Sequence, residues 1–445
     1  MLIESISGVR GTVGDGLTKE TIRDYVDAFH LFSPDGQIVI GRDSRPSGSE
    51  FASEIINRLK ELGRSVKDCG IIPTPTVQFT VESSDEIGGI VITASHNPSE
   101  WNGLKFVGGD GCFLNGDEVK ALMALKGTNP EISQLSGERI EDKDAVNRHI
   151  AKICDVSWID LNAIKNRCFR VAVDAVNGAT AEALPMFLSA FGCEVITINC
   201  ETSGAFVRGT EPLPKNLAEL ASVVKEKMCD VGLASDPDGD RLAIIDETGK
   251  PIGEEYTLVL ALDSFLQSGK SSAPVVTNLS TTLAMERVAA RHSIQVLRSA
   301  VGEINVVEMM KENGSLIGGE GNGGVILKEV HLGRDSLVAA AALLQRLSLT
   351  DETLSGVMSQ LPRFEIVKDK VSVEGIEANV LFEKIAESFD DASRDERDGL
   401  KLSWNNRWVH IRASNTEPIL RIYAEATTAD EARRIAQKVK AIVKE

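Results

Sequence analysis

The sequence predicts an α/β protein with three similar α/β domains and a smaller C-terminal α+β domain. Three times along the chain an apolar run leads into a polar loop and then into amphipathic helices, which is typical of parallel-rich α/β units. From about residue 364 onward, β-forming residues predominate and the pattern changes. The length of 445 residues agrees with several domains, because it exceeds what one ordinary core accommodates.

The first unit is placed in residues 1–155. An apolar run over 38–40 leads into a polar loop, and an amphipathic helix is predicted over 51–62. The chain then returns through a second helix to an apolar strand over 90–92. The unit closes on the polar loop 93–98.

The same order of elements recurs in residues 156–254 and 255–365, and these units close on the loops 235–241 and 318–324. If the units are structural repeats, the three closing loops lie at equivalent sheet ends and converge on one cleft. In these two units, strands are predicted over 171–173, 231–233, 275–276 and 316–317. Helices are predicted over 217–227, 282–291 and 304–312, and one further helix is predicted to end at residue 190.

The last unit is placed in residues 366–445. It combines several β-rich runs with two helical patterns, which indicates an α+β domain. The strands are predicted over 366–373, 400–404, 408–413 and 419–424, and the helices over 380–388 and 429–443.

The composition is that of a soluble globular protein, with 42% hydrophobic and 26% charged residues. The formal net charge of -18 argues against nucleic acid as a partner, because its phosphates would be repelled. Residues 1–5 show no basic region followed by a long apolar segment, and no later apolar run approaches membrane length. Seven scattered cysteines without Cys-x-x-Cys spacing indicate reduced thiols. We therefore expect a cytoplasmic protein with no membrane partner.

The loop Thr-Ala-Ser-His-Asn-Pro, residues 93–98, directly follows an apolar strand. Loops at this end of an open α/β sheet face ligands. Ser95 and the adjacent His96 imidazole therefore stand where a reactive hydroxyl is expected. A Ser/Asn turn without chemistry is the alternative on this hexapeptide alone.

Three aspartates, Asp236, Asp238 and Asp240, alternate through the second closing loop. Pro and Gly keep the chain irregular there, so the carboxylates can turn toward one point, and hard oxygen ligands of this kind suit Mg²⁺. A helix-loop-helix calcium site fails, because Arg241 stands where that loop needs Gly and residues 242–245 look like a strand. A solvated acidic turn is the remaining alternative.

Two further loops carry groups that suit a polar ligand. Glu320 and Asn322 lie in a glycine-rich loop without dinucleotide spacing, where they would suit neighbouring sugar hydroxyls; a flexible glycine turn is the alternative. Near the C-terminus, guanidinium, hydroxyl and amide groups between two strands can enclose a phosphate dianion, and an ordinary hairpin loop is the alternative. These residues are Arg412, Ser414, Asn415, Thr416 and the following Arg421.

Arg10 and Lys105 are weaker candidates. Arg10 lies between glycines and could direct a cation at a phosphoryl group, while Lys105 places an amine just beyond Ser95. Each is individually common: a surface ion-pair arginine and a solvated lysine are the alternatives.

Together these motifs resemble the α-D-phosphohexomutase family, which includes phosphoglucomutases, phosphomannomutases and phosphoglucosamine mutases. The resemblance spans essentially the whole chain and rests above all on 93–98, on Asn102-Gly103-x-Lys105 and on the segment 236–241. It implies three mixed-sheet α/β domains and a smaller C-terminal α+β domain around a central active-site cleft. It also implies that Ser95 carries a phosphoryl group and, with the three aspartates, holds Mg²⁺. The implied substrate-binding residues are Arg241, Glu320, Asn322, Arg412, Ser414, Asn415, Thr416 and Arg421.

The sequence departs from this family's pattern in the sugar loop. Many members have Glu-x-Ser-Gly-His there, whereas Asn322 takes the Ser place and Gly324 the His place in this chain. A histidine acid at position 324 is therefore excluded. His331 could supply an imidazole from another direction, or it is a packing or surface residue. The variant resembles a branch often assigned to phosphoglucosamine mutase.

The resemblance implies reversible phosphate transfer between O6 and O1 of a hexose or hexosamine phosphate, with glucosamine 6-phosphate and glucosamine 1-phosphate favoured. Phosphorylated Ser95 would donate to the sugar and give a 1,6-bisphosphate, which also serves as activator, while Mg²⁺, Arg10 and Arg241 neutralise charge. Lys105 is the first candidate for proton transfer, with His96 beside it. Glucose or mannose phosphates, a phosphatase, and a non-catalytic phosphosugar-binding protein are the alternatives. A small-molecule phosphosugar is the expected partner, and a homodimer is a possible assembly.

Overall fold

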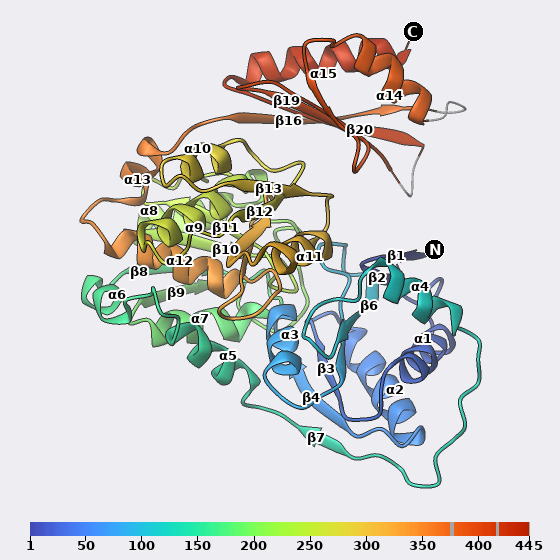
Figure 1. Cartoon of the computed structure of the whole chain (residues 1–445). Coiled ribbons are helices and arrows are strands. Elements are labelled where there is room, and N and C mark those ends of the chain that lie inside the picture. The colour runs from blue at the N-terminus through green and yellow to red at the C-terminus, as the bar shows by residue number, and fades with distance from the viewer. Residues whose placement is uncertain (374–377, 415–417, 445) are drawn as a thin grey trace.

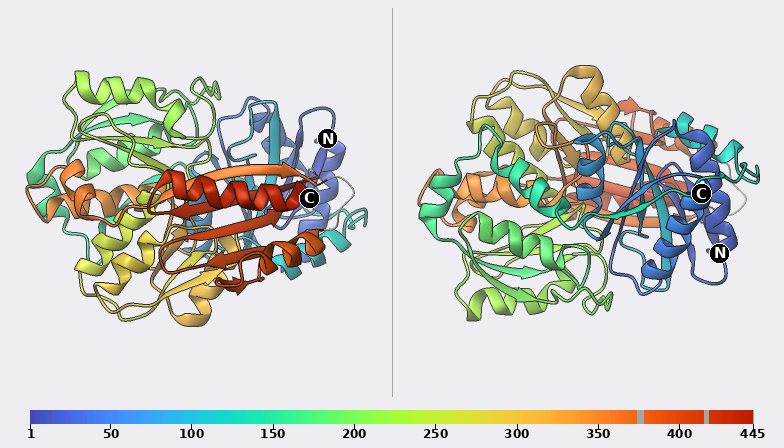
Figure 2. Two further views of the ribbon diagram at one scale, coloured as in Figure 1. Left: turned by 90° about the horizontal axis from the view of Figure 1, so that it is seen from above. Right: turned by 90° about the horizontal axis from the view of Figure 1, so that it is seen from below.

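The computed structural model describes residues 1–373, 378–414 and 418–444. Figure 1 shows three α/β units with an antiparallel sheet and its helices above them. The views in Figure 2 show that this C-terminal part lies over the region where the α/β units meet. The expected architecture of three mixed-sheet α/β domains and a smaller fourth domain is confirmed.

The first sheet has the strand order β1-β2-β6-β5-β3-β4-β7. Strands β4, β3 and β5 run parallel, whereas β6 pairs antiparallel with both β5 and β2. Residues 90–92 of β5 are at most 1% exposed, which explains why this central strand is a continuous apolar run. The strands are β1 (Leu2–Ser5), β2 (Gly8–Thr12), β3 (Ile38–Arg42), β4 (Val66–Ile71), β5 (Gly88–Ile92), β6 (Trp101–Gly108) and β7 (Arg139–Glu141), and the helices are α1 (Lys19–Phe32), α2 (Gly48–Glu61), α3 (Thr74–Glu82) and α4 (Gly116–Ala124).

The second sheet has the order β11-β10-β8-β9. Its strands β9, β8 and β10 run parallel, and β11 closes the sheet antiparallel to β10. The strands are β8 (Arg170–Asp174), β9 (Glu194–Ile198), β10 (Val231–Ser235) and β11 (Leu242–Asp246); the helices before and between them are α5 (Ala145–Cys154), α6 (Leu161–Arg167), α7 (Thr180–Ala190), the short 3-10 helix η1 (Pro214–Asn216) and α8 (Ala218–Glu226).

The third sheet repeats this arrangement with the order β13-β12-β14-β15. Strands β13, β12 and β14 are parallel, and β15 is antiparallel to β14. The strands are β12 (Val275–Asn278), β13 (Val296–Ser299), β14 (Ile317–Glu320) and β15 (Gly324–Leu327), and the helices are α9 (Glu255–Gln267), α10 (Ala284–Ala290), α11 (Glu303–Asn313), α12 (Ser336–Ser348) and α13 (Leu354–Gln360).

The three α/β sheets therefore share one motif, in which a central parallel strand turns back into an antiparallel partner. The motif is β5–β6 in the first sheet, β10–β11 in the second and β14–β15 in the third. The connections inside these pairs contain Ser95, the aspartates 236–240 and Asn322, respectively. The expectation that the three closing loops are structurally equivalent is confirmed by the strand pairing.

The second and third α/β units share one hydrophobic core. Helices α9 and α12 pack against each other in this core, and residues 336–347 of α12 are all buried. A run of alanines, 339–342, allows this close approach. Asp335 caps the helix by accepting a hydrogen bond from the Leu337 main-chain nitrogen at 2.8 Å, a type of contact typically worth about 1 kcal/mol.

The fourth sheet is antiparallel with the order β16-β20-β19-β18-β17, and it has its own core. Side chains on its strands reach the third unit: Lys401 donates to the main-chain oxygen of Leu279, and His410 Nδ1 lies 2.8 Å from Ser280 Oγ. The strands are β16 (Glu365–Ser372), β17 (Ser393–Asp395), β18 (Leu400–Ser403), β19 (Trp408–Ala413) and β20 (Ile419–Ala426), and the helices are α14 (Ala378–Glu387) and α15 (Ala429–Lys444). Among the helices of the described residues, none combines the length and apolar character that crossing a membrane requires.

Candidate active site

The loop after β5 carries Ser95 and is held by a buried ion pair. Arg45 donates from Nη2 to the main-chain oxygen of Ser95 at 2.7 Å, and its Nε lies 2.9 Å from Asp43 Oδ2. Thr93 Oγ1 donates to the same Asp43 oxygen at 2.6 Å and accepts from the Ser95 main-chain nitrogen at 2.8 Å. Asp43 and Arg45 follow β3, the parallel neighbour of β5, so the adjacent strand end fixes this loop. Neither residue was predicted from the sequence as part of the site.

Ser95 adopts a φ of 51°, in the left-handed region that few non-glycine residues occupy. Its hydroxyl lies 3.3 Å from Nδ1 of His96. Burial, together with the nearby guanidinium groups of Arg241 and Arg10, lowers the pKa of His96 to about 3. The imidazole is therefore neutral at pH 7.

Asp236, Asp238 and Asp240 occupy the turn between β10 and β11. Each offers a carboxylate oxygen within 4.8 Å of the others, and all three residues are at most 1% exposed. One oxygen of each carboxylate has no hydrogen-bond partner among the described residues. Gly239 has a φ of 74°, which favours glycine and lets the chain turn within the cluster. Three buried acceptors this close together fit a hard divalent cation.

The protonation of this cluster reflects its crowding. Burial and the charges of Asp240 and Asp238 raise the pKa of Asp236 well above its usual value. Burial also opposes ionisation of Asp238, but the charge and hydrogen bond of Lys105, together with the hydrogen bond from Thr74, outweigh it and lower the pKa of Asp238. For Asp240, burial is outweighed chiefly by Arg334, and its pKa is lowered as well. A bound cation would relieve the repulsion that remains.

Lys105 reaches the aspartates from β6. Its Nζ lies 2.8 Å from Asp238 Oδ2 and 3.9 Å from Asp240 Oδ2, and the residue is 5% exposed. Thr74 Oγ1 donates to the same Asp238 oxygen at 3.0 Å. The lysine that the sequence placed just beyond Ser95 is therefore a buried ion-pair partner of the aspartate loop, and the alternative of a solvated lysine is wrong.

Arg10 and Arg241 flank these groups. Arg10 Nη1 donates to Asn97 Oδ1 at 3.2 Å, and burial lowers the pKa of Arg10 from its usual value. Arg241 Nε lies 3.6 Å from Asp240 Oδ1 and 3.9 Å from Asp236 Oδ2. Two cations thus stand beside the serine loop and the aspartate loop.

Glu320 is held rigidly at the end of β14. Its Oε1 accepts from Asn278 Nδ2 at 2.7 Å and from the Gly302 main-chain nitrogen at 2.9 Å. Burial opposes its ionisation, but the Arg334 guanidinium and the hydrogen bonds from Asn278 and Gly302 together outweigh burial and lower the pKa of Glu320. Asn322 accepts through Oδ1 from the Gly324 main-chain nitrogen at 3.2 Å. The carboxylate is ionised and oriented, as recognition of a sugar hydroxyl requires.

Arg334 is a central residue that was not predicted from the sequence. It precedes α12 and contacts three buried carboxylates: its Nε lies 3.0 Å from Glu303 Oε2, its Nη1 2.5 Å from Glu320 Oε2 and its Nη2 2.5 Å from Asp240 Oδ2. The only sequence signal is a charged residue directly before the helix cap Asp335. That signal does not reveal three partners from three separate segments.

The arginines of the predicted phosphate loop stand side by side. Arg412 on β19 and Arg421 on β20 are cross-strand partners, so two like charges face one another. Arg412 Nε lies 2.9 Å from Asp398 Oδ2. The main-chain nitrogen of Ser414 donates to Ile419 O at 3.0 Å. Asn415 and Thr416, which were predicted for the same loop, lie outside the described residues.

Two adjoining cavities bring these side chains together. One, of about 330 Å³, is lined by Ser95, Lys105, Arg10 and Arg334; the other, of about 390 Å³, reaches Arg412. They share the lining residues His96, Arg241, Val301, Glu320, Asn322 and Arg421. The serine, sugar and phosphate loops therefore open onto one continuous region.

His331 lies away from these cavities. Its Nε2 lies 3.2 Å from Asp335 Oδ2, which also lies 2.9 Å from His149 Nε2. Both imidazoles are buried, and their rings meet edge to face at 5.5 Å. Of the two roles considered for His331, the structure supports packing.

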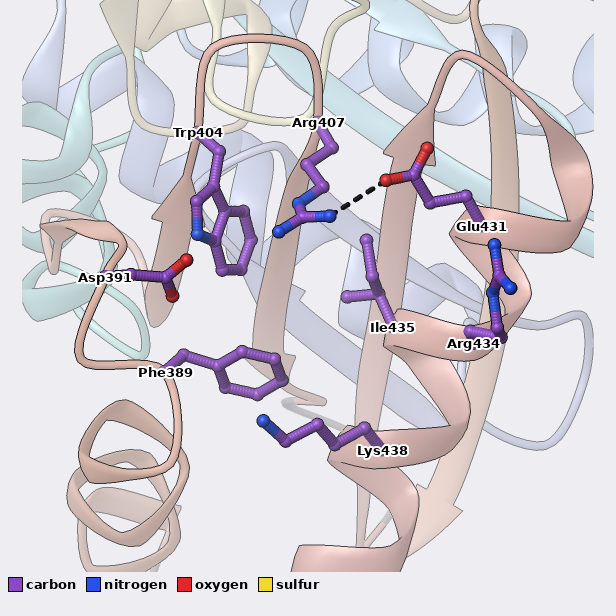
Figure 3. Close-up of a pocket in the computed structure, with 8 residues that line it drawn as sticks. All are labelled: Phe389, Asp391, Trp404, Arg407, Glu431, Arg434, Ile435 and Lys438. Atoms are coloured by element: carbon purple, nitrogen blue, oxygen red, sulfur yellow. Dashed lines mark hydrogen bonds and ion pairs between the residues drawn. The ribbon is translucent and has the colours of Figure 1, made fainter.

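A further pocket lies on the fourth domain between α15 and the β18–β19 loop (Figure 3). Its volume of about 370 Å³ is similar to those of the other cavities. Two of its cations are engaged: Arg407 Nη1 lies 2.9 Å from Glu431 Oε1, and Lys438 donates to Ser388 O at 2.8 Å. It is lined by Phe389, Asp391, Trp404, Arg407, Glu431, Arg434, Ile435 and Lys438 and contains none of the groups of the site described above.

Comparison with known families matches the chain in four consecutive parts. The matches are to the alpha/beta/alpha domains I, II and III and the C-terminal domain described for phosphoglucomutase/phosphomannomutase. They cover residues 3–131, 147–249, 253–364 and 370–442, respectively.

Individual relatives extend over the full length. A phosphoglucomutase/phosphomannomutase of Thermococcus kodakarensis is 34% identical over 96% of this chain and 95% of its own. A phosphoglucosamine/phosphogalactosamine mutase of Sulfurisphaera tokodaii is 31% identical over 98% of both chains. The crystal structure of a phosphoglucomutase/phosphomannomutase family protein from Burkholderia thailandensis has a TM-score of 0.87 and 26% identity, and covers 100% of this chain and 98% of that one. The chain belongs to the phosphoglucomutase/phosphomannomutase family of α-D-phosphohexomutases and is a phosphosugar mutase.

Proposed function

We propose that the enzyme interconverts hexosamine 6-phosphate and hexosamine 1-phosphate, with the glucosamine phosphates as its preferred pair. The observation that carries the proposal is that Ser95, Glu320 and the Arg412–Arg421 pair line two adjoining cavities beside the aspartate cluster. A phosphoryl carrier, a sugar-recognising carboxylate and a second anion site are what a sugar phosphate needs when it binds in two orientations.

The chemistry runs through Ser95. The free sugar hydroxyl attacks the phosphorus atom of phosphorylated Ser95, so that a new O–P bond forms while the bond from Ser95 Oγ breaks. The sugar oxygen loses its proton, and the serine oxygen gains one and ends as a hydroxyl. The 1,6-bisphosphate then reorients, and its other phosphate returns to Ser95 by the reverse steps. The same bisphosphate, supplied in trace amounts, loads an unphosphorylated enzyme.

Lys105 is our first candidate for the proton transfer. Its ammonium lines the cavity that contains Ser95, and its pairing with Asp238 holds it there. His96 is the neighbouring candidate, which orients the reacting groups or substitutes for the lysine, because its Nδ1 lies 3.3 Å from Ser95 Oγ. Arg10 and Arg241 stabilise the charge on the transferring group.

Asp236, Asp238 and Asp240 would hold Mg²⁺, together with an oxygen of the Ser95 phosphoryl group. Their unpartnered oxygens and crowded charges fit that ion. When bound, Mg²⁺ neutralises charge on the phosphoryl group and makes phosphorus more electrophilic. The protein's part is to keep the three carboxylates buried and oriented, which Lys105, Arg334 and Arg241 do through ion pairs with Asp238, Asp240 and Asp236, respectively.

Preference for an amino sugar is supported by Glu211. Its carboxylate lies on the wall of the cavity that also contains Glu320, and it is 4.0 Å from the neutral imidazole of His96. An ammonium group at C2 of the sugar would gain an ion pair there. Glucose and mannose phosphates remain the second candidates, because a relative that is 34% identical has the name phosphoglucomutase/phosphomannomutase.

The test compares glucosamine, glucose and mannose 1-phosphates with Mg²⁺ and a trace of each matching bisphosphate. We expect the highest kcat/KM for the glucosamine compound, and a loss of that preference in Glu211→Gln. Glu201→Gln, an exposed change in the same connecting segment, is the control and should keep the preference. A wild-type preference for glucose or mannose would overturn the proposed substrate.

A further inference from the structure

The side chain of Arg334 occupies the space that a side chain at position 324 would need. A Cβ atom added to Gly324 would lie 2.3 Å from Arg334 Cδ and 2.9 Å from Arg334 Cγ, closer than real Cβ contacts occur. Gly324 is not among the residues with positive φ, so its backbone would accept a side chain. The arginine side chain, rather than the conformation of the loop, is therefore what excludes a larger residue at position 324.

Each nitrogen of the guanidinium that fills this space faces a buried carboxylate. Its Nε, Nη1 and Nη2 point to the carboxylates of Glu303, Glu320 and Asp240 at 3.0, 2.5 and 2.5 Å, respectively. All four residues are at most 9% exposed. Arg334 therefore acts on the site through these carboxylates and is a positioning residue.

The three carboxylates come from different segments with different tasks. Asp240 lies in the aspartate loop between β10 and β11, Glu320 ends β14 in the sugar loop, and Glu303 begins α11. Arg334 fixes Oδ2 of Asp240, and Oδ1 of that residue is the oxygen without a hydrogen-bond partner among the described residues. The arginine thus determines which oxygen of Asp240 remains available in the aspartate cluster.

We propose that Gly324 and Arg334 form one functional unit, in which the absent side chain at 324 admits an arginine that positions Asp240 for the cation and Glu320 for the sugar. The inference rests on the proposed function in treating the aspartate cluster as a cation site and Glu320 as the sugar-binding carboxylate, and its test uses the cation alone. It links the glycine at position 324 to the identity of residue 334. A side chain at 324 is compatible with an intact site only when residue 334 is small.

The test is a double-mutant cycle read by Mn²⁺ binding to unphosphorylated enzyme without sugar, followed by electron paramagnetic resonance. We expect Arg334→Ala to weaken Mn²⁺ binding about tenfold, as the loss of partners that orient metal ligands does elsewhere. Gly324→Ala should weaken it similarly, because the added methyl group displaces the arginine. In the Arg334→Ala background, however, Gly324→Ala should change the dissociation constant by less than about twofold, because the clash no longer exists.

Two control variants separate positioning from general destabilisation. Arg346→Met removes a buried arginine of α12, the helix that Arg334 precedes; its Nε lies 2.7 Å from Asp263 Oδ2. Gly356→Ala adds a methyl group where the nearest atom is at 3.6 Å. Both should keep wild-type Mn²⁺ affinity, even if Arg346→Met lowers the melting temperature.

The outcomes are distinct. Unchanged or tighter Mn²⁺ binding in Arg334→Ala, or independent effects of the two substitutions, would overturn the inference. Because neither sugar nor phosphorylated Ser95 takes part, a wrong sugar assignment leaves this result untouched. A wild-type enzyme that binds no Mn²⁺ would contradict both the inference and the cation site.

Discussion

The Lys105 ammonium lies 2.8 Å from Asp238 Oδ2 and joins a strand of the first domain to a loop of the second. Lys105 is on β6, which pairs with the strand before Ser95, and Asp238 is in the turn between β10 and β11. Both residues are at most 5% exposed, so water screens their attraction little. The ion pair therefore fixes the separation between the serine strand and the aspartate loop.

Lys105→Arg should separate the two roles of this lysine. The guanidinium keeps the charge beside Asp238, so the melting temperature should stay close to that of the wild type, but arginine does not release a proton at neutral pH. We expect kcat to fall by about 10²- to 10⁴-fold, the usual contribution of proton transfer by a side chain. Steady-state assays check this, with the exposed Lys120→Met as control. A kcat within threefold of the wild type would assign proton transfer to another group.

Arg421→Met should weaken substrate binding. The arginine faces Arg412 across the two strands, and a phosphate between them would gain a charge-assisted contact from each. One such contact contributes about 1.5–3 kcal/mol to the free energy of binding. Its loss should therefore raise KM by about 10- to 100-fold. The control is Arg433→Met, a surface arginine paired with Asp430 on α15. An unchanged KM in Arg421→Met would place the non-reacting phosphate elsewhere.

His410 should make the enzyme sensitive to acid. Burial lowers its pKa from the ordinary 6.5 to about 4, and it packs at the contact between the third and fourth domains. The unfolded chain therefore binds a proton below pH 6.5 that the folded chain does not. Neutral His410 therefore makes its full contribution to the free energy of unfolding above pH 6.5. This contribution is lost as the pH falls toward 4, at a rate of up to about 1.4 kcal/mol per pH unit.

The measurement for this prediction is urea unfolding between pH 7 and 4.5. His410→Gln should give a shallower loss of stability in that range than the wild type. His292→Gln, at an exposed histidine, should behave like the wild type. Equal slopes in wild type and His410→Gln would show that other groups control the acid response.

Much of the fold could be predicted from local patterns. The apolar run of β5 and the loop motifs with Ser95 and the three aspartates are continuous in sequence, so their periodicity and spacing are visible without a structure. The predicted repeat of strand, helix and closing loop is also confirmed, because each α/β sheet contains the same parallel strands followed by an antiparallel strand. The short strands β1, β2 and β7 have no comparable signal, since sheet pairing rather than local pattern defines them.

The supporting residues of the site could not be predicted in the same way. Arg45 reaches the Ser95 loop across 50 residues, and Arg334 reaches Asp240 across 94. An arginine beside a helix or loop is usually a surface residue, and only the folded chain shows that these two are buried among oxygen atoms. The glycine at 324 was visible in the sequence, but its reason, the side chain of Arg334, was not.

The most direct test of the central claim locates the phosphoryl group after the enzyme is incubated with the sugar 1,6-bisphosphate. Peptide mapping by mass spectrometry should find one phosphoryl group on Ser95. Ser95→Ala should carry none and should lose mutase activity, while Ser53→Ala, at an exposed serine on α2, should be phosphorylated on Ser95 as the wild type is. A phosphoryl group on another residue, or substantial mutase activity in Ser95→Ala, would contradict the account.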